Sequence, residues 1–226
     1  MKNTMKKWLV VMNVLVALSA MLVGCGSAPD EFKEKSYTAS AEEVDSITID
    51  TKDRKIEILP SEDEQIHITY YENDKEFYNI ALSGEKELSM TSADSKQWND
   101  YIGGKSAQKV RIIQVWIPDA TLKNLNLKTS NEDISVPSLS FASKAELRTN
   151  NGNIEINRLN VGTEVTLEAK NGDINGSIVG TFDDFAISSK VKKGKSNLPA
   201  NKKDGSKKLS AYANNGDISI EFVNSQ

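Results

Sequence analysis

The chain has 226 residues, of which 27% are charged and 38% are hydrophobic, with a formal net charge of −4 and one cysteine, Cys25. The single cysteine excludes a framework of intramolecular disulfides. The acidic balance argues against a nucleic-acid-binding protein, which needs a basic face to displace counterions from phosphates. The length fits one elongated domain behind a targeting segment.

Residues 1–24 are predicted to be a lipoprotein signal peptide. Three lysines precede an apolar run of 16 residues, 8–23, which is the arrangement of a secretion signal. The run is short for a permanent span of a ~30 Å hydrocarbon core. Its end resembles the lipobox of bacterial lipoproteins, formed here by Leu22, Val23, Gly24 and Cys25. That resemblance implies that the Cys25 thiol receives a diacylglycerol and that Cys25 becomes the first residue after cleavage.

A diacylglycerol on Cys25 would give stable anchoring, because two acyl chains bury enough methylene groups to hold a protein on a bilayer. The expected location is the outer face of the bacterial cytoplasmic membrane, and the lysine-rich and asparagine-rich composition favours a Gram-positive source. Residues 25–44 lack a strand pattern and are expected to form a flexible, lipid-anchored tether. Residues 45–226 are then the folded domain, and the chain without its signal peptide has a net charge of −7.

From Ser46 onward apolar and polar residues alternate, for example at Ile47 and Ile49 and again at Ile56 and Ile58. A period of two residues indicates strands with one buried face. No stretch after residue 43 has the spacing of an amphipathic helix. The domain is therefore predicted to be all-β.

Three related segments, "RTNNGNIEIN" (148–157), "AKNGDINGSI" (169–178) and "YANNGDISIE" (212–221), indicate an internal repeat of about 20 residues. Such a period with short strands is typical of a solenoid, in which each coil buries its apolar face against its neighbours. We predict a right-handed β-solenoid, or a stacked β-strand repeat fold, with successive coils lying over one another. An antiparallel meander or sandwich is the alternative, since Asn-Gly also forms hairpin turns.

The repeats predict corners at which the chain turns before an isoleucine re-enters the core. Glycine would supply a positive φ there, and Asn or Asp would hydrogen-bond its own backbone. The interior file would contain Ile134, Ile154, Ile174 and Ile218. The corner residues are Asn131, Asp133, Asn151, Gly152, Asn153, Asn171, Gly172, Asp173, Asn215, Gly216 and Asp217.

A column of aspartates at equivalent corners could bind calcium through carboxylate oxygens. Asn153 interrupts the column of Asp133, Asp173 and Asp217, and Lys193 lies near a fourth corner. Both residues relieve repulsion between stacked carboxylates without a cation. We therefore predict a structural turn ladder, with no metal and no other cofactor.

The sequence contains no convincing set of residues for catalysis. His67 is the single histidine, and a zinc site would need further histidine or thiol ligands. A glycosidase would need two carboxylates held ~5 to 10 Å apart in a cleft, and no pair of acids stands out. The sequence predicts no catalytic residues and no enzymatic activity.

One lysine-rich segment, 190–208, contrasts with the acidic remainder of the chain. It contains one acid, Asp204, and eight lysines: Lys190, Lys192, Lys193, Lys195, Lys202, Lys203, Lys207 and Lys208. These lysines could bind anionic lipid or anionic wall polymers. Alternatively, they prevent an open sheet edge from pairing with another molecule.

The lipobox, "ITIDTKDRKIEIL", "VWIP" and the repeats closing on "NNGDISIEF" together resemble the bacterial putative-adhesin family, a domain of unknown function built of β-strand repeats. The resemblance covers residues 45–226. It implies a β-solenoid-like fold and an envelope location, and it transfers no catalytic residue.

We therefore expect a membrane-anchored, non-enzymatic lipoprotein that binds or scaffolds envelope polymers or a surface protein. One alternative is a regulatory lipoprotein that reports envelope stress, and another is a polysaccharide-processing β-helix enzyme. The sequence leaves the ligand and the oligomeric state open.

Overall fold

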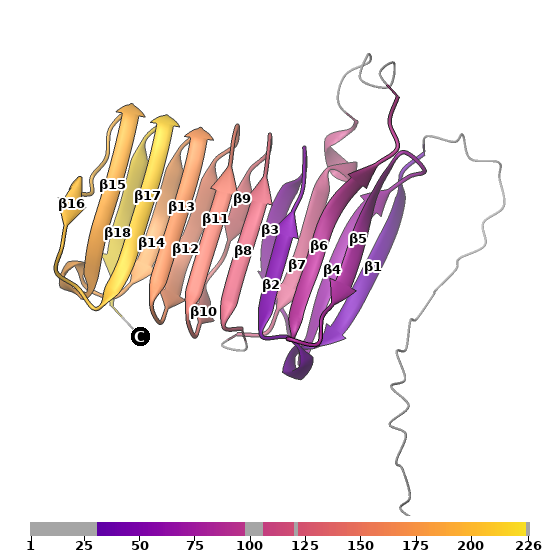
Figure 1. Ribbon diagram of the computed structural model, residues 1–226, viewed down its shortest axis with the longest axis horizontal. Helices are drawn as coiled ribbons and strands as arrows, with labels where there is room; N and C mark the ends of the chain where they lie inside the picture. Colours follow the sequence, from indigo (N-terminus) through magenta and orange to yellow (C-terminus); the bar gives the residue numbers. More distant parts are fainter. Residues whose placement is uncertain (1–30, 98–105, 120–121, 225–226) are drawn as a thin grey trace, which may run out of the picture.

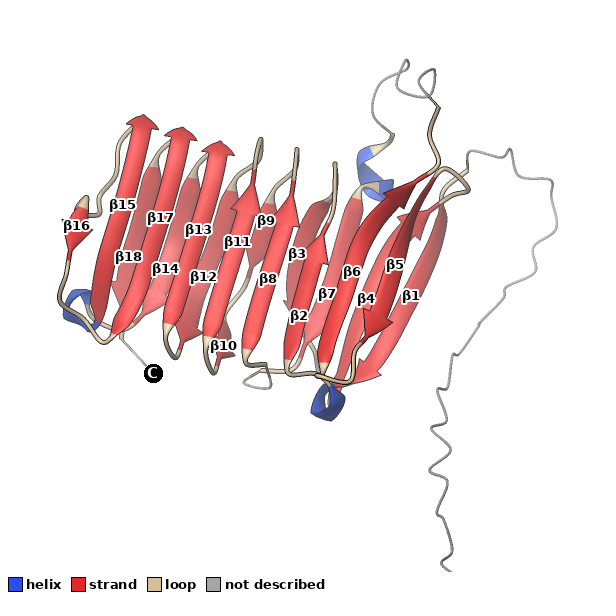
Figure 2. Ribbon diagram, viewed as in Figure 1, coloured by secondary structure: helices blue, strands red, loops and turns tan. Residues whose placement is uncertain are grey.

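The computed structural model describes residues 31–97, 106–119 and 122–224. Within these ranges the chain forms strands and three short 3-10 segments, η1 (Ala41–Glu43), η3 (Gln108–Val110) and η4 (Phe182–Asp184). Figures 1 and 2 show the strands standing side by side in two layers, so that the molecule is long in the stacking direction. None of its described helices is long and apolar enough to cross a bilayer. The predicted signal peptide and Cys25 lie outside the described residues.

The two layers are nine-stranded sheets. In spatial order, the first sheet contains β1 (Lys33–Ser40), β4 (Gln65–Glu72), β7 (Ile112–Ile117), β3 (Lys55–Pro60), β9 (Ile134–Val136), β12 (Ile154–Val161), β14 (Ile174–Val179) and β18 (Ile218–Val223), with β10 (Leu139–Phe141) also paired to β12. The second contains β16 (Asn201–Lys202), β15 (Phe185–Lys193), β17 (Lys207–Asn215), β13 (Glu164–Asn171), β11 (Lys144–Thr149), β8 (Asn124–Thr129), β2 (Ser46–Asp50), β6 (Glu87–Asp94) and β5 (Glu76–Leu82).

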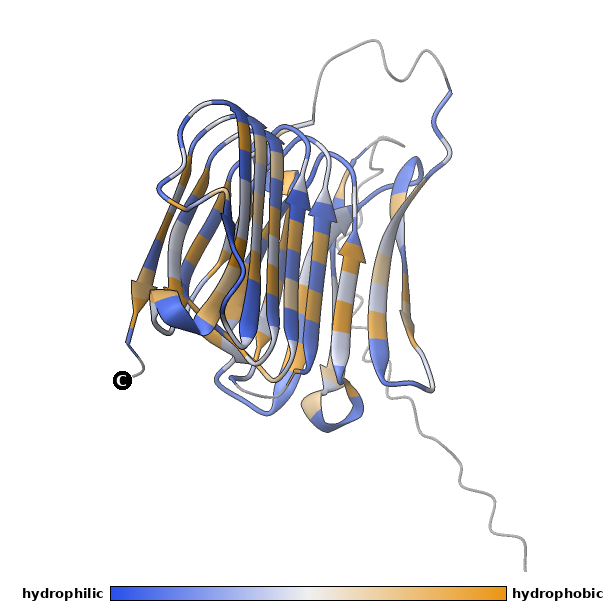
Figure 3. Ribbon diagram, turned by 60° about the vertical axis from the view of Figure 1, so that its left-hand side comes forward, coloured by the Kyte–Doolittle hydropathy of each residue, from blue (hydrophilic) through white to orange (hydrophobic). Residues whose placement is uncertain are grey.

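Alternation along the strands puts one face of each sheet into a shared core. Figure 3 shows this as bands of hydrophobic and hydrophilic residues along each ribbon. Ile134 pairs in parallel register with Ile154, Ile154 with Ile174, and Ile174 with Ile218. All four side chains are buried, and Ile56 continues the file beyond Ile134. The stacked fold and its interior isoleucine file are confirmed.

The N-terminal strands belong to the same stack as the repeats. β2 pairs in parallel with β8, and β3 pairs in parallel with β9. On the other side of this coil, β6 and β7 pair in parallel with β2 and β3. The pattern changes beyond them, because β4 pairs antiparallel with β1 and β7, and β5 pairs antiparallel with β6. The sequence alone did not say whether these strands shared one stack with the repeats, and they do.

The coils do not all follow chain order. β17 and β18 pair with β13 and β14, and β15 lies on the far side of β17. In the second sheet the last coil of the sequence thus lies inside the stack and the unit around 187–198 forms its end, whereas β18 is the last strand of the first sheet. The prediction that successive coils lie over one another is wrong here. The reason lies in the corner residues described below.

The prediction of a tether from residue 25 to residue 44 is wrong from Lys33 onward. β1 pairs with β4 over eight residues, Lys33–Ser40, and η1 follows it directly. β1 lacks the usual alternation because it is an edge strand, and Ala39 is its one fully buried residue. Edge strands commonly carry charged side chains in this way.

The end of the stack formed by β15 and β18 is covered by the loop between β15 and β17. The side-chain amide of Asn197 donates to the carbonyl of Ile220 (2.8 Å), and its oxygen accepts the Ile220 N–H (3.0 Å). Leu198 is buried in the core, and β16 pairs with part of β15. Asn197 thus satisfies an edge backbone that would otherwise accept another strand.

Candidate functional site

A column of asparagine side chains runs along one corner of the stack. The side-chain amide of Asn151 donates to Asn131 Oδ1 (2.6 Å), that of Asn171 to Asn151 Oδ1 (2.7 Å), and that of Asn215 to Asn171 Oδ1. The Asn131 amide in turn donates to the Asp53 carboxylate. Asn131, Asn151 and Asn171 thus each act as both donor and acceptor between neighbouring coils, as in other stacked asparagine ladders.

A second column lies two residues further along each corner. Asp133 Oδ1 accepts the backbone N–H of Asn153 (2.7 Å), Asn153 Oδ1 accepts that of Asp173 (2.9 Å), and Asp173 Oδ1 accepts that of Asp217 (2.8 Å). The sequence predicted that these side chains would bond their own backbone. They bond the next coil instead, because the parallel register brings that N–H within reach.

The corner glycines are required for close approach between coils. A Cβ on Gly152 would lie 2.1 Å from the Glu132 carbonyl oxygen, and one on Gly172 would lie 2.0 Å from that of Gly152. Among the corner glycines of the three repeats, Gly216 alone has a positive φ, +152°. The prediction that glycine supplies a positive φ is therefore wrong for Gly152 and Gly172, where any side chain would collide with the neighbouring backbone.

Both columns stop at the end coil. In register with Asn215, Gly216 and Asp217 stand Lys193, Gly194 and Lys195. The Lys195 N–H still donates to Asp217 Oδ1 (2.7 Å), but a lysine side chain has no acceptor to offer a further coil. This explains why β17 lies between β13 and β15 and why the unit containing Lys193 lies at the end of the second sheet.

The aspartates of the second column do not converge on a cation site. Their inner oxygens already accept backbone N–H groups, and asparagine stands between Asp133 and Asp173. Across residues 31–97, 106–119 and 122–224, no three acidic, histidine or cysteine side chains gather as ligands. The corner residues act within the fold, as a ladder between coils.

His67 lies on the outer face of the first sheet between two polar partners. Its Nε2 is 3.0 Å from the Asp63 carboxylate, and its Nδ1 is 3.3 Å from Thr38 Oγ1. Hydrogen bonds from Ser61 and then from His67 hold the pKa of Asp63 below its ordinary value. The order hydroxyl, imidazole, carboxylate is that of a nucleophilic relay. Here, however, His67 and Asp63 are 36% and 56% exposed and stand on an open strand face.

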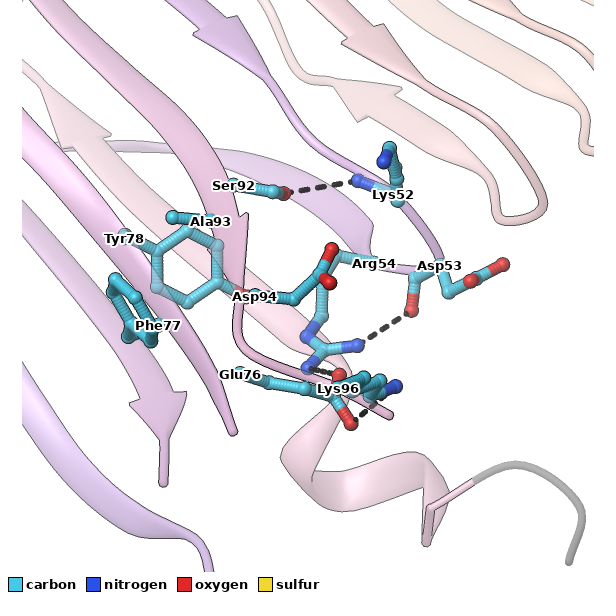
Figure 4. A pocket seen from close by; sticks show the side chains of 10 residues that line it. All are labelled: Lys52, Asp53, Arg54, Glu76, Phe77, Tyr78, Ser92, Ala93, Asp94 and Lys96. Carbon is cyan, nitrogen blue, oxygen red and sulfur yellow. Dashed lines mark hydrogen bonds and ion pairs between the residues drawn. The ribbon is translucent and has the colours of Figure 1, made fainter. Parts of the chain in front are cut away.

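A small pocket of about 110 Å³ lies where β5 and β6 meet the corner before β3 (Figure 4). Arg54 is its central residue and is 3% exposed. Its guanidinium donates to the Glu76 carboxylate (2.7 Å) and to the Asp53 carbonyl (3.1 Å), and Lys96 contacts the other Glu76 oxygen (2.8 Å). The Arg54 Nε is buried with no hydrogen-bond partner among the described residues.

Charges in this pocket balance one another. Three carboxylates face three cations, and the complete lining is Lys52, Asp53, Arg54, Glu76, Phe77, Tyr78, Ser92, Ala93, Asp94 and Lys96. Burial raises the pKa of Glu76, but hydrogen bonds from Lys96 and Arg54 outweigh it and leave the pKa below its ordinary value. Burial raises the pKa of Tyr78. The arrangement is a neutral ion cluster that packs the corner and favours neither an anion nor a cation.

Sequence reasoning missed Arg54, although its position carried a signal. Parallel pairing aligns Ile56 with Ile134 and Ile134 with Ile154, so Asp53, Arg54 and Lys55 occupy the corner that Asn151, Gly152 and Asn153 form in a later coil, with Glu132 at the middle position of the coil between them. A large cation at a glycine position indicates a corner without the close neighbour that the glycines require.

The lysine-rich segment lies at the end of the stack, on β15, β16, β17 and their loop. Two of its lysines are partly buried and contact Phe185. Lys202 donates to the Phe185 carbonyl (2.9 Å), and the Lys207 ammonium lies 5.7 Å from the centre of the Phe185 ring. The remaining six are exposed: Lys190, Lys192, Lys193, Lys195, Lys203 and Lys208. None of the eight forms an ion pair with the described part of the chain.

Residues 44–179 match the family model described as Toastrack DUF4097. Among solved structures, a "putative cell adhesion protein" from Clostridium sporogenes aligns with a TM-score of 0.60 at 13% identity, over 85% of this chain and 100% of that one. Putative adhesins from Bacteroides fragilis and Parabacteroides merdae align with TM-scores of 0.36 and 0.35, at 11% and 18% identity. They cover 88% and 83% of this chain, and 100% and 81% of their own.

No curated protein matches the sequence. At 13% identity, the Clostridium structure shows a shared fold alone. The family model spans more than half of the chain, and the matched family is a β-strand repeat domain, as the sequence predicted. This chain belongs to the Toastrack DUF4097 family.

Proposed function

We propose that this protein is a lipoprotein of the outer face of the bacterial cytoplasmic membrane, which holds a rigid β-stack in the envelope to bind or scaffold other envelope components. The main support for the proposal is the position at which the chain enters the fold. Lys33 begins β1, the outermost strand of the first sheet, eight residues after Cys25. Eight residues reach at most ~28 Å. A lipid on Cys25 would therefore keep the β1 end of the stack close to the bilayer.

The opposite end would then extend into the envelope. The first sheet runs through eight strands from β1 to β18, and at ~4.8 Å for each of seven steps they hold β18 roughly 34 Å from β1. Close coil packing, corner ladders and a continuous core make this a rigid spacer. Such a body suits presentation of a surface at a fixed distance from a membrane.

Binding is a better fit to the described side chains than catalysis. The Arg54 pocket is small and its charges are already paired. The Thr38, His67 and Asp63 group lies on an exposed sheet face, where His67 and Asp63 are open to solvent. A hydrolytic relay needs a site that positions substrate and stabilises developing charge. Turnover of a wall glycan that disappears on substitution of one acidic residue would overturn this part of the proposal.

The anchor is tested by the Cys25→Ala variant, with Ser27→Ala as a matched control two residues away. We expect Ser27→Ala to remain in the membrane fraction and to incorporate labelled fatty acid. Cys25→Ala should incorporate none, and it should be released or retain its signal peptide. Equal membrane retention and equal labelling of the two variants would contradict the proposal.

A further inference from the structure

Ion pairing changes along the outer face of the second sheet. In its central strands, each basic side chain has an acidic partner: Lys128 with Asp50 (2.8 Å) and Lys144 with Glu164 (3.0 Å). Arg148 Nε lies 3.3 Å from the Glu168 carboxylate. The acids of β13 are therefore engaged towards β11, on the side away from β17 and β15.

Towards the β15 end of the sheet, the end of β13 and the strands β17 and β15 carry lysines that lack such partners. Lys190 and Lys192 of β15 and Lys208 of β17 point outward, because Ser189 and Leu209 beside them are buried and Val191 packs against the core. Lys170 of β13 is exposed at the same height as Lys192, since Asn171 pairs with Asn215 and Asn215 with Lys193. Among the residues that the structure describes, these four form no ion pair. We call them the outer lysine surface.

The corner ladder does not explain the outer lysine surface. Lys193 and Lys195 end the two columns, and Lys202 and Lys207 contact the Phe185 region. The four outer lysines do neither, although Lys190 also lies 5.9 Å from the Tyr212 ring centre. The register places them on three adjacent strands, over six residue steps along the strand direction. This makes a stripe roughly 20 Å long and 10 Å wide.

The charge of this end is opposite to that of the rest of the protein. Residues 181–223 contain eight lysines and five acids, a net charge of +3, on a chain whose net charge is −4. The nearest acids at the corner, Asp173 and Asp217, each accept a backbone N–H with one oxygen. The stripe is therefore a local positive region that attracts anions, on a protein whose net negative charge repels them.

Lysine chemistry narrows the class of partner. The segment has no arginine, so it offers point charges without the bidentate fork that reads a single phosphate or carboxylate. An extended row of ammonium groups suits a repeating polyanion, which exchanges many weak contacts and releases counterions. A bilayer surface on the anchored side is a poorer fit, because the stripe lies at the end of the sheet remote from β5 and β6.

We propose that the outer lysine surface, Lys170, Lys190, Lys192 and Lys208, binds a phosphodiester-linked polyanion of the cell wall. The orientation relative to the membrane rests on the proposed function, whereas the surface itself rests on the strand register and the ion pairs. Binding is governed by charge density, and it weakens steeply with salt.

The test uses the full chain in neutral detergent micelles and fluorescent poly(glycerol phosphate) as the probe, with anisotropy measured from about 50 to 200 mM salt. One variant combines Lys190→Gln, Lys192→Gln and Lys208→Gln. The matched control combines Lys123→Gln, Lys128→Gln and Lys144→Gln, three lysines that are already ion-paired. Both variants change the net charge equally, and circular dichroism verifies that both remain folded.

We expect the outer variant to lose at least tenfold in affinity and about one unit of salt slope per lysine, with the control close to wild type. Equal losses in the two variants would overturn the inference, as would no binding to the polymer at the lowest salt. Tighter binding to phosphatidylglycerol vesicles or to duplex DNA than to the polymer would also overturn it. Polymer binding by the protein in micelles does not depend on membrane anchoring. Its outcome is therefore independent of the Cys25→Ala fractionation.

Discussion

Asn171 donates its side-chain amide to Asn151 across 20 residues of sequence and one step of the stack, at 2.7 Å. The same bond recurs between Asn151 and Asn131. The side chain of Asn151 is therefore held from both sides. A column of this kind couples each corner to the next, so its middle member should matter more to stability than an isolated polar residue.

Asn151→Ala should lower the free energy of unfolding by about 1 to 2 kcal/mol, because it removes two side-chain hydrogen bonds and leaves Asn131 and Asn171 without one partner each. Urea denaturation measures the change. The control is Asn175→Ala, at an exposed position on β14, which should change stability by less than about 0.5 kcal/mol. Equal effects of the two substitutions would show that the column contributes nothing.

Gly172→Ala should destabilise the protein by roughly 3 kcal/mol or more, since its Cβ would lie 2.0 Å from the Gly152 carbonyl oxygen and backbone must shift to admit it. Gly84→Ala is the control, because no atom lies within 4 Å of the added carbon. Thermal unfolding of both variants tests the point. A Gly172→Ala protein as stable as the Gly84→Ala protein would contradict the close approach of the coils.

The Arg54 and Glu76 pair should make stability depend on pH. Because the folded pKa of Glu76 is lowered, its contribution is present above the unfolded value of 4.5 and is lost as pH falls through the folded pKa. Glu76→Gln should abolish this part of the acid dependence. It should also cost about 3 kcal/mol at neutral pH, because it leaves Arg54 buried without its carboxylate.

The measurement for Glu76 is urea denaturation repeated between neutral pH and about pH 3. Glu85→Gln serves as the control, since Glu85 lies exposed in the turn between β5 and β6. It should retain the acid dependence of the wild-type protein. An unchanged pH profile in Glu76→Gln would show that the ion cluster does not titrate with folding.

Restoring the repeat at the end coil should permit association with a second copy. Lys193→Asn combined with Lys195→Asp recreates the corner that continues both columns, and it leaves acceptors facing solvent where lysine offered none. Light scattering should show concentration-dependent assembly. Lys190→Asn with Lys203→Asp makes the same change in charge away from the corner and should remain at the wild-type molecular mass.

Much of the fold could be predicted because local patterns reflect a burial requirement. Alternation identified β2 and β3, and the repeats identified the corners and the file of Ile134, Ile154, Ile174 and Ile218. The order of the coils could not be predicted from alternation, since a period of two specifies which face is buried and says nothing about which strand is the neighbour. The missing information was that the side chains of Asn215 and Asp217 can accept hydrogen bonds from a further coil, whereas those of Lys193 and Lys195 cannot.

Two further features were inaccessible for different reasons. β1 buries Ala39 fully and little else, so its sequence carries no pattern, and its pairing depends on the free edge of β4. The Arg54 cluster joins residues 22 positions apart, Arg54 and Glu76, and ion pairs of this range leave no periodic trace. Thr38 likewise reaches His67 only through the pairing of β1 with β4, whereas Asp63 is a local partner four residues before His67.

The position of β17 between β13 and β15 has a consequence for synthesis. β15 leaves the ribosome before β17 does, yet its parallel partner is β17. A nascent chain that ends near residue 200 thus presents β13 and β15 as two separate open edges. The stack closes only after the final residues of the chain have been translated, so that a protein truncated near its C-terminus would lack a sealed end.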